Sequence, residues 1–242
     1  MDAKHATKIL IGTRQQLAKC NNPSITIGDS IIEASDCVRN LGAYFDKHMS
    51  MAQHIKTKCR DAYVQLYNIA KIRKYLDDCS AEQLIHALVH SHIDYCNSLL
   101  VGLPKYLIKK LQMVQNTAAR VLCRVGKFDH ITPTLKRLHW LPVVFRIKYK
   151  VCLLTFNGLH GHGPKYINDM LRVKQTRYGL RSSSVISLEV PASKHKTLGD
   201  RAFSVAAPIL WNDLPNDLRA ISDAPTFKAK LKTHFFSQAY IG

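Results

Sequence analysis

The amino-acid sequence predicts an α+β fold that is mainly α-helical, with a small N-terminal β-hairpin or sheet followed by a helical bundle and further helices. Short β-rich runs separated by turn residues fill residues 1–47, whereas apolar residues recur at helical spacing from about Met51 onward. Hydrophobic residues make up 46% of the 242-residue chain, which is enough for a packed core. We expect three segments, at 1–47, 48–126 and 127–242.

Three runs in the first segment favour β-structure, namely TKILIGT (7–13), SITIGDSIIEAS (24–35) and CVRNLGAYFD (37–46). Gly28-Asp29 separates two β-rich halves and is a typical two-residue hairpin turn. In the third run the spacing of the apolar residues predicts a buried set, consisting of Val38, Leu41, Ala43 and Phe45.

Three helices are predicted for the second segment. Apolar residues recur every three or four positions after Met51 and form one stripe, made of Ile55, Cys59, Ala62, Leu66 and Ile69. A second helix is expected over residues 80–100, with Ser80 as its N-cap and Gln83 in the capping-box position. A third runs from about Lys105 to Val125 and is stopped by Gly126. Short connections between them predict a small bundle.

Further helices are predicted around Thr132–Leu138, Val144–Phe156 and Pro164–Leu171, again from apolar periodicity. The stretch SVISLEVP (184–191) is a candidate strand. A last helix is expected over APTFKAKLKTHFFSQ (224–238).

The charge of the chain favours a polyanionic partner. There are 35 Lys and Arg against 17 Asp and Glu, and residues 105–188 hold sixteen basic residues but only Asp129 and Asp169 as acids. Nucleic acid is the natural counterion of such a surface. An anionic membrane is less favoured, because no basic run adjoins an insertable apolar face and no apolar run approaches the ~20 residues of a membrane span. We therefore expect no membrane partner.

Seven cysteines are scattered through the sequence without a CxxC pair, and MDAKHATKIL lacks the apolar core of a secretory signal. An odd number of cysteines argues against a disulfide framework. We therefore expect a reducing, intracellular compartment, nuclear or cytoplasmic.

Tyr75-Leu76-Asp77-Asp78 has the form of the metal-binding signature of reverse transcriptases. A polymerase holds two divalent ions on carboxylates that a tight strand–turn–strand presents rigidly. Here a basic helix end precedes the tetrapeptide and another helix start follows it. Asp78 or Ser80 is expected to offer an oxygen to free N–H groups, where acids also favour the helix dipole. The local context therefore favours a helix cap over a catalytic centre, and no catalytic residue is expected.

The third predicted helix has two faces. On a helical wheel its apolar residues share one arc, formed by Leu107, Leu111, Val114, Ala118, Val121, Leu122 and Val125. Lys105, Lys109, Arg120 and Arg124 lie opposite, as a basic stripe roughly 20 to 30 Å long. Such a stripe suits a phosphate backbone, although a solvated helix face is the plainer interpretation of one stripe alone.

Basic residues continue beyond this helix, and the continuation favours nucleic-acid binding. The full set of candidate nucleic-acid-binding residues is Lys105, Lys109, Arg120, Arg124, Lys127, Lys136, Arg137, Arg146, Lys148 and Lys150. His139, Trp140 and Tyr149 are interleaved with them, and cations with aromatics can bind a strand by charge and stacking. Trp140 fits a packed core or joint better than a base platform.

His90, His92 and Cys96 are spaced like metal ligands, and Asp94 lies among them. Nothing in the sequence supplies the rest of a tetrahedral zinc shell, so core packing is the favoured interpretation. We expect no metal ion and no cofactor.

Three sequence blocks carry a resemblance to a known family. They are DYCNSLLVGLP (94–104), LHWLPVVFRIKYK (138–150) and WNDLP (211–215), and the segments between them agree in order. The chain resembles the C-terminal part of the reverse transcriptase of non-LTR (LINE-type, jockey-like) retrotransposons over nearly its whole length.

The resemblance implies a parent protein that is an RNA-directed DNA polymerase with an endonuclease and uses Mg²⁺. Residues 1–47 would be the end of the palm, 48–126 a thumb-like bundle, and 127–242 a basic C-terminal region. The fingers, the catalytic palm strands and the endonuclease would lie upstream, and the palm and fingers would be packing partners.

The resemblance and the charge together predict a truncated retrotransposon fragment that binds template–primer RNA, DNA or RNA–DNA hybrid without polymerase catalysis of its own. Two alternatives stay open. One is a residual enzyme that depends on Asp77 and Asp78. The other is a helical protein-interaction module or a non-functional relic of a mobile element, which would bind nucleic acid negligibly.

Overall fold

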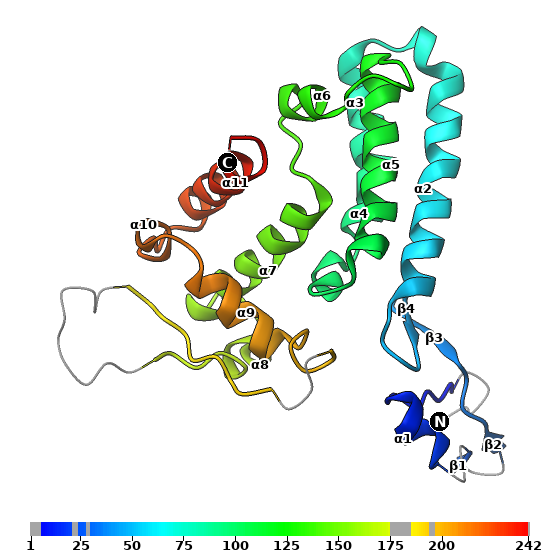
Figure 1. Cartoon of the computed structure of the whole chain (residues 1–242), viewed down its shortest axis with the longest axis vertical. Helices are drawn as coiled ribbons and strands as arrows, with labels where there is room; N and C mark the ends of the chain where they lie inside the picture. The colour runs from blue at the N-terminus through cyan, green and yellow to red at the C-terminus, as the bar shows by residue number, and fades with distance from the viewer. Residues whose placement is uncertain (1–5, 21–23, 28–29, 175–184, 194–196, 242) are drawn as a thin grey trace.

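A computed structural model describes residues 6–20, 24–27, 30–174, 185–193 and 197–241. Within them the fold is mainly α-helical with two small antiparallel sheets, so the predicted α+β class is confirmed. Figure 1 shows the sheets at the N-terminal end of the molecule, a bundle of long helices beyond them, and the C-terminal helices beside that bundle. No helix in the described ranges is long and apolar enough to cross a membrane.

The first sheet is the predicted hairpin. Strand β1 (Ile25–Ile27) pairs with β2 (Ser30–Ile32), and Ile27 lies opposite Ser30. The predicted turn residues, Gly28 and Asp29, lie outside the described residues.

The run at 37–46 forms a second hairpin rather than one strand. Strand β3 (Cys37–Asn40) pairs with β4 (Ala43–Asp46) across Leu41 and Gly42, whose φ angles of 46° and 79° are those of a two-residue hairpin turn. The turn leaves Leu41 87% exposed, so its predicted burial is wrong, whereas Ala43 is buried as predicted.

The first predicted strand, 7–13, is also wrong. Among the described residues it makes only a single bridge, between Lys8 and Ala34. A short helix, α1 (Arg14–Ala18), follows at once, because the side chain of Thr13 accepts a hydrogen bond from the backbone of Gln16 and Gln16 reciprocates.

The bundle begins with α2 (Ala52–Ile72), and every residue of the predicted apolar stripe in it is buried. The predicted second helix forms in pieces, which are α3 (Asp78–Ile85), a π-helical turn η3 (His86–His90), α4 (Ser91–Asp94) and the 3-10 turn η4 (Asn97–Leu100). Its N-cap is Asp77 and not Ser80, because the Asp77 carboxylate accepts a hydrogen bond from the Ser80 backbone N–H and the helix starts earlier.

Helix α5 (Lys105–Cys123) ends where Arg124 takes a left-handed conformation, close to the predicted stop. Its predicted apolar arc faces the core. Leu107, Leu111, Val114, Ala118 and Leu122 are buried, and Val121 and Val125 are half-buried. Figure 1 shows α2 and α5 running side by side.

Four of the remaining helices lie close to their predicted positions, namely α6 (Thr132–Arg137), α7 (Val143–Leu159), α8 (Lys165–Asp169) and α11 (Ala224–Tyr240). Helices α9 (Phe203–Asn212) and α10 (Asn216–Arg219) were not predicted. The candidate strand at 184–191 is wrong, since its described part makes a single bridge between Leu188 and Val173.

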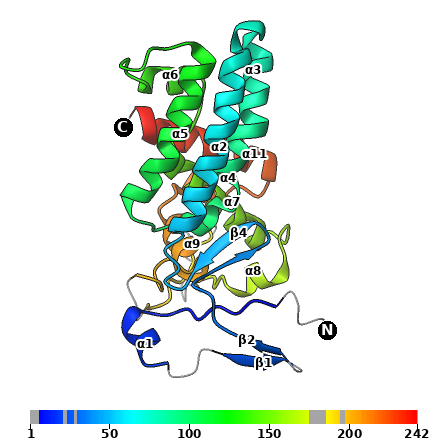
Figure 2. The ribbon, with the colours of Figure 1, turned by 90° about the vertical axis from the view of Figure 1, so that its right-hand side faces the viewer.

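Helix α7 joins two clusters of buried residues. Val143 and Ile147 pack into the core of the bundle, whereas Val151 and Phe156 pack into a second core with α9 and α11. Figure 2 shows α7 and α11 behind the bundle, and the sheets at the lower end of the view. The helix thereby fixes the C-terminal helices against the bundle, and the three-segment division of the sequence stays a prediction.

Candidate nucleic-acid interface

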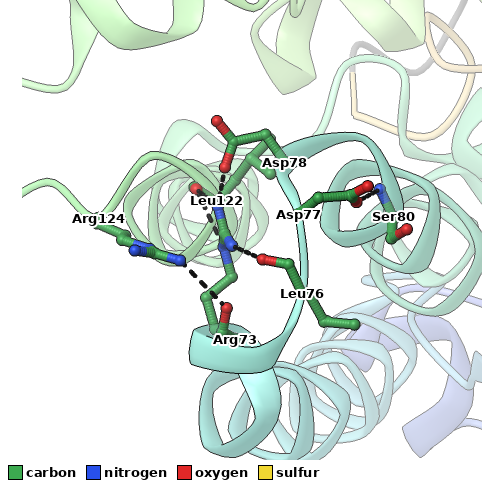
Figure 3. Close-up of polar contacts among 7 residues, drawn as sticks. All are labelled: Arg73, Leu76, Asp77, Asp78, Ser80, Leu122 and Arg124. Atoms are coloured by element: carbon green, nitrogen blue, oxygen red, sulfur yellow. Dashed lines mark hydrogen bonds and ion pairs between the residues drawn. The ribbon is translucent and has the colours of Figure 1, made fainter.

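Asp77 and Asp78 lie at the start of α3, and Leu76 separates them from the 3-10 turn η2 (Arg73–Tyr75). The Asp77 carboxylate accepts a hydrogen bond from the backbone N–H of Ser80, with an N–O distance of 2.7 Å. Asp78 forms an ion pair with the guanidinium of Arg73. The two carboxylates point in different directions, one toward Ser80 and the other toward Arg73 (Figure 3). A helix cap is therefore present, but Asp77 provides it and not the predicted Asp78 or Ser80.

Arg73 holds the ends of two helices together. Its side chain is buried and donates to the carbonyl oxygen of Leu122 through Nε and Nη2, at 3.2 and 2.7 Å, and to that of Leu76 at 2.8 Å. Leu122 lies in the last turn of α5, whose carbonyl groups have no partner within the helix. The guanidinium thus satisfies the end of α5, where the helix dipole also favours a cation.

Five of the predicted site residues are exposed lysines that form no ion pair with any described acid, namely Lys105, Lys109, Lys127, Lys136 and Lys150. They come from α5, the loop after it, α6 and α7. Their ammonium groups are accessible to a polyanion, as the prediction requires.

The predicted arginines have partners within the protein. Arg120 donates to the carbonyl oxygens of Gly126 and Asp129, at 3.0 and 2.9 Å, and Arg124 donates to that of Arg73. Arg146 pairs with the carboxylate of Asp94 and is mostly buried. Carbonyl partners leave the positive charge in place, but Asp94 balances the charge of Arg146.

Two further predicted residues have mixed surroundings. Arg137 lines a cleft together with Arg124 and three acids, Asp77, Asp78 and Glu82. Lys148 is half-buried, and its ammonium lies 5.5 Å from the ring centroid of Phe145. The exposed lysines therefore carry more of the available positive charge than the rest of the predicted set.

The aromatic residues interleaved with these cations differ in exposure. Trp140 is 3% exposed and its ring packs edge-on against those of His86 and His90, which matches the favoured interpretation of a joint residue. His139 is exposed, and Tyr149 is half-buried.

Exposed aromatic side chains with lysines over them were not predicted. The ammonium of Lys71 lies 4.3 Å from the ring centroid of Tyr67, and that of Lys74 lies 4.7 Å from Tyr75, at 62% and 77% exposure of the two tyrosines. Phe128 is 93% exposed beside Lys127. In the sequence, Tyr67 and Lys71 are four residues apart within one helix, whereas Lys74 and Lys127 directly precede their aromatic partners. Such pairs can stack on bases.

The suspected zinc ligands do not converge. Among the residues that the structure describes, no group of three or more His, Cys, Asp or Glu side chains is placed to hold a metal ion. His90 is buried, and its Nδ1 lies 2.9 Å from that of His86. All seven cysteines are free thiols.

His90 makes the stability of the fold depend on pH. Burial lowers the pKa of His90 to about 2, with smaller contributions in the same direction from Arg146 and His86. An unfolded chain protonates this residue near 6.5, so below that pH the unfolded state binds more protons and stability falls. We expect His90 to account for a loss of about 2 kcal/mol in the free energy of unfolding between pH 7 and pH 5.

Urea denaturation at pH 7, 6 and 5 checks this expectation. The variant His90→Gln should show a flatter pH dependence than the wild type, whatever its absolute stability. Equal slopes in the two proteins would exclude His90 as the source, and the pKa of His54, also lowered by burial, affects both proteins alike.

Comparison of the chain with protein-family models, with curated proteins and with solved structures gave no match. The functional proposal therefore rests on the exposed lysines, on the exposed aromatic rings that lie beside a lysine ammonium group, and on the sequence resemblance.

Proposed function

We propose that the chain binds RNA, DNA or an RNA–DNA hybrid through the exposed lysines of α5, α6, α7 and the loop between the first two. The observation that carries this proposal is the set of five exposed lysines without a described acidic partner, on a protein of formal net charge +18. Lysine side chains on a helical surface contact phosphates without reading bases, so the binding is expected to be insensitive to sequence.

The proposal extends to the origin of the chain. The blocks 94–104, 138–150 and 211–215 support descent from the C-terminal part of a non-LTR retrotransposon reverse transcriptase. In that setting the bundle serves as a thumb that holds the template–primer duplex. The order of two β-hairpins followed by a helical bundle is compatible with the end of a palm and a thumb.

Catalysis is not part of the proposal. Asp77 caps α3 and Asp78 pairs with Arg73, so both carboxylates already have structural roles. No residue is proposed to hold magnesium.

A second candidate function has one observation in its favour. Strands β1 and β2 expose three isoleucines, Ile25, Ile27 and Ile31, at 42%, 37% and 72%. A two-stranded sheet with apolar side chains in solvent is marginal alone and suits a protein partner, which in a reverse transcriptase would be the rest of the palm.

Binding of a labelled RNA–DNA duplex at increasing salt tests the proposed function. The logarithm of the association constant should fall linearly with the logarithm of the salt concentration, with a slope of about −4.5 if the five lysines each contact a phosphate. An uncharged-backbone oligonucleotide of the same sequence is the control and should not bind. Undetectable binding of the duplex at low salt, or an affinity that salt leaves unchanged, would contradict the proposal.

A further inference from the structure

A cavity of about 310 Å³ lies where the bundle meets α7 and α11. Its walls come from η3, the turn after α4, the segment that precedes α7, α7 itself and one residue of α11. Its volume is at the lower end of the range of ligand pockets, ~300 to 1,000 Å³.

Two buried polar atoms of the cavity wall have no hydrogen-bond partner among the described residues. They are the side-chain oxygen Oδ1 of Asn97 and the indole Nε1–H of Trp140, on residues that are 4% and 3% exposed. The amide nitrogen of Asn97 is occupied, since it donates to Asp94 over 3.2 Å. Buried polar groups in folded proteins are nearly always paired. Both side chains line the cavity, and each carries one unpaired polar atom, an acceptor on Asn97 and a donor on Trp140.

The other walls suit a flat ring. Leu141, Leu153 and the half-buried Tyr149 line the cavity beside the indole of Trp140. The rings of His86 and His90 pack against that indole, with centroid distances of 5.5 and 4.2 Å, and fix its orientation. Both histidines belong to the π-helical turn η3, and π-helical turns occur frequently at functional sites.

Two exposed lysines contribute positive charge to the lining of the cavity. Lys150 of α7 and Lys232 of α11 are exposed and line it. Asp94 also lines it, but its carboxylate is paired with Arg146. An anionic group attached to the ring would therefore meet two lysines that have no ion pair with a described acid.

We propose that this cavity holds one nucleotide unit. The base lies between the apolar and aromatic walls, its hydrogen-bonding edge meets Asn97 and Trp140, and its phosphate meets Lys150 and Lys232. Every base has an edge that combines donors and acceptors, and pockets for single bases combine such contacts with stacking. The nucleotide is either a free nucleoside monophosphate or an unpaired nucleotide of a bound strand, and the second source rests on the proposed function.

Direct binding to the full chain tests the proposal for a free nucleotide. Adenosine, guanosine, cytidine and uridine 5′-monophosphates are titrated by calorimetry into the wild type and two variants. Trp140→Phe keeps a ring but removes the N–H donor, and Lys232→Gln removes a surface charge without touching the core. Each should weaken binding of at least one monophosphate about 3- to 10-fold, and inorganic phosphate should not compete at equal concentration.

A second titration tests the strand as the source. An RNA–DNA duplex with one unpaired 2-aminopurine nucleotide at its end reports burial of that base by its fluorescence. Sensitivity of this signal to Trp140→Phe and Lys232→Gln, with blunt-duplex binding unchanged, assigns the cavity to an unpaired nucleotide even if free monophosphates do not bind. If neither ligand senses the two variants, the cavity holds no nucleotide and the proposal is overturned. If the wild type does not bind the blunt duplex at all, that result contradicts the proposed function instead.

Discussion

Reversal of four exposed lysines, Lys105, Lys109, Lys127 and Lys136, to glutamate is expected to weaken binding of an RNA–DNA duplex at least about 100-fold at ~0.1 M salt. Each change removes a phosphate contact and adds a like-charge repulsion. All four side chains are exposed and none has a hydrogen bond or ion pair with a described residue, so the fold should not change. Fluorescence anisotropy with the labelled duplex measures the loss.

A control with the same change in net charge separates local contact from long-range attraction. The exposed lysines Lys165, Lys174, Lys228 and Lys230 lie outside the candidate interface and are reversed together. This control should lose far less affinity than the first variant. If the two variants lose the same affinity, the positive charge acts only in bulk and the assigned interface is wrong.

Replacement of Arg73 by Met is expected to lower the free energy of unfolding by about 3 to 5 kcal/mol, measured by urea denaturation. The methionine keeps the apolar stem, but the carbonyl oxygens of Leu122 and Leu76 lose a charged donor in a buried position. The ends of α2 and α5 would then lose the group that joins them.

Two matched variants define the source of that loss. Arg60→Met removes an exposed guanidinium from α2, where its ion pair is with the neighbouring Asp61, and should leave stability nearly unchanged. Asp78→Asn removes the carboxylate partner of Arg73, but its side chain is 92% exposed and the expected loss is small. A stability of Arg73→Met that matches that of Arg60→Met would show that Arg73 does not hold the two helix ends together.

The helices were predictable because their signals are local. In α2 an apolar residue recurs every three or four positions, and the core of the bundle is the direct consequence. Gly126 lies two residues beyond Arg124, where α5 ends, so that stop could also be predicted.

The wrong predictions have two sources. Either two neighbouring residues could both act as the cap, or a run of apolar residues fitted one strand as well as a hairpin. Asp77 and Ser80 are both good N-caps, and only the structure shows that the Asp77 carboxylate takes the Ser80 N–H. In the run 37–46 the pattern predicted burial of Leu41, whereas Leu41 and Gly42 adopt positive φ angles and reverse the chain. A left-handed leucine is rare enough that no sequence rule favours it.

The site could be predicted in part. Exposure of the lysines follows from the helical wheel, and Lys105 and Lys109 lie opposite the buried arc as expected. The pairing of Arg146 with Asp94 joins residues 52 positions apart, and such a contact has no local signal. For the same reason the cavity between the bundle, α7 and α11 could not be predicted, although Trp140 was recognised as a joint residue.

The central claim is that the exposed lysines contact phosphates directly, and the number of ions released on binding measures this. Duplex association constants are determined between about 0.05 and 0.2 M salt for the wild type and for the variant with the four reversed lysines of the interface. The slope of log association constant against log salt should become shallower by about 3 to 4 in the variant, close to 0.9 for each lost phosphate contact. Equal slopes for the two proteins would contradict the account, because the nucleic acid would then be held by other residues.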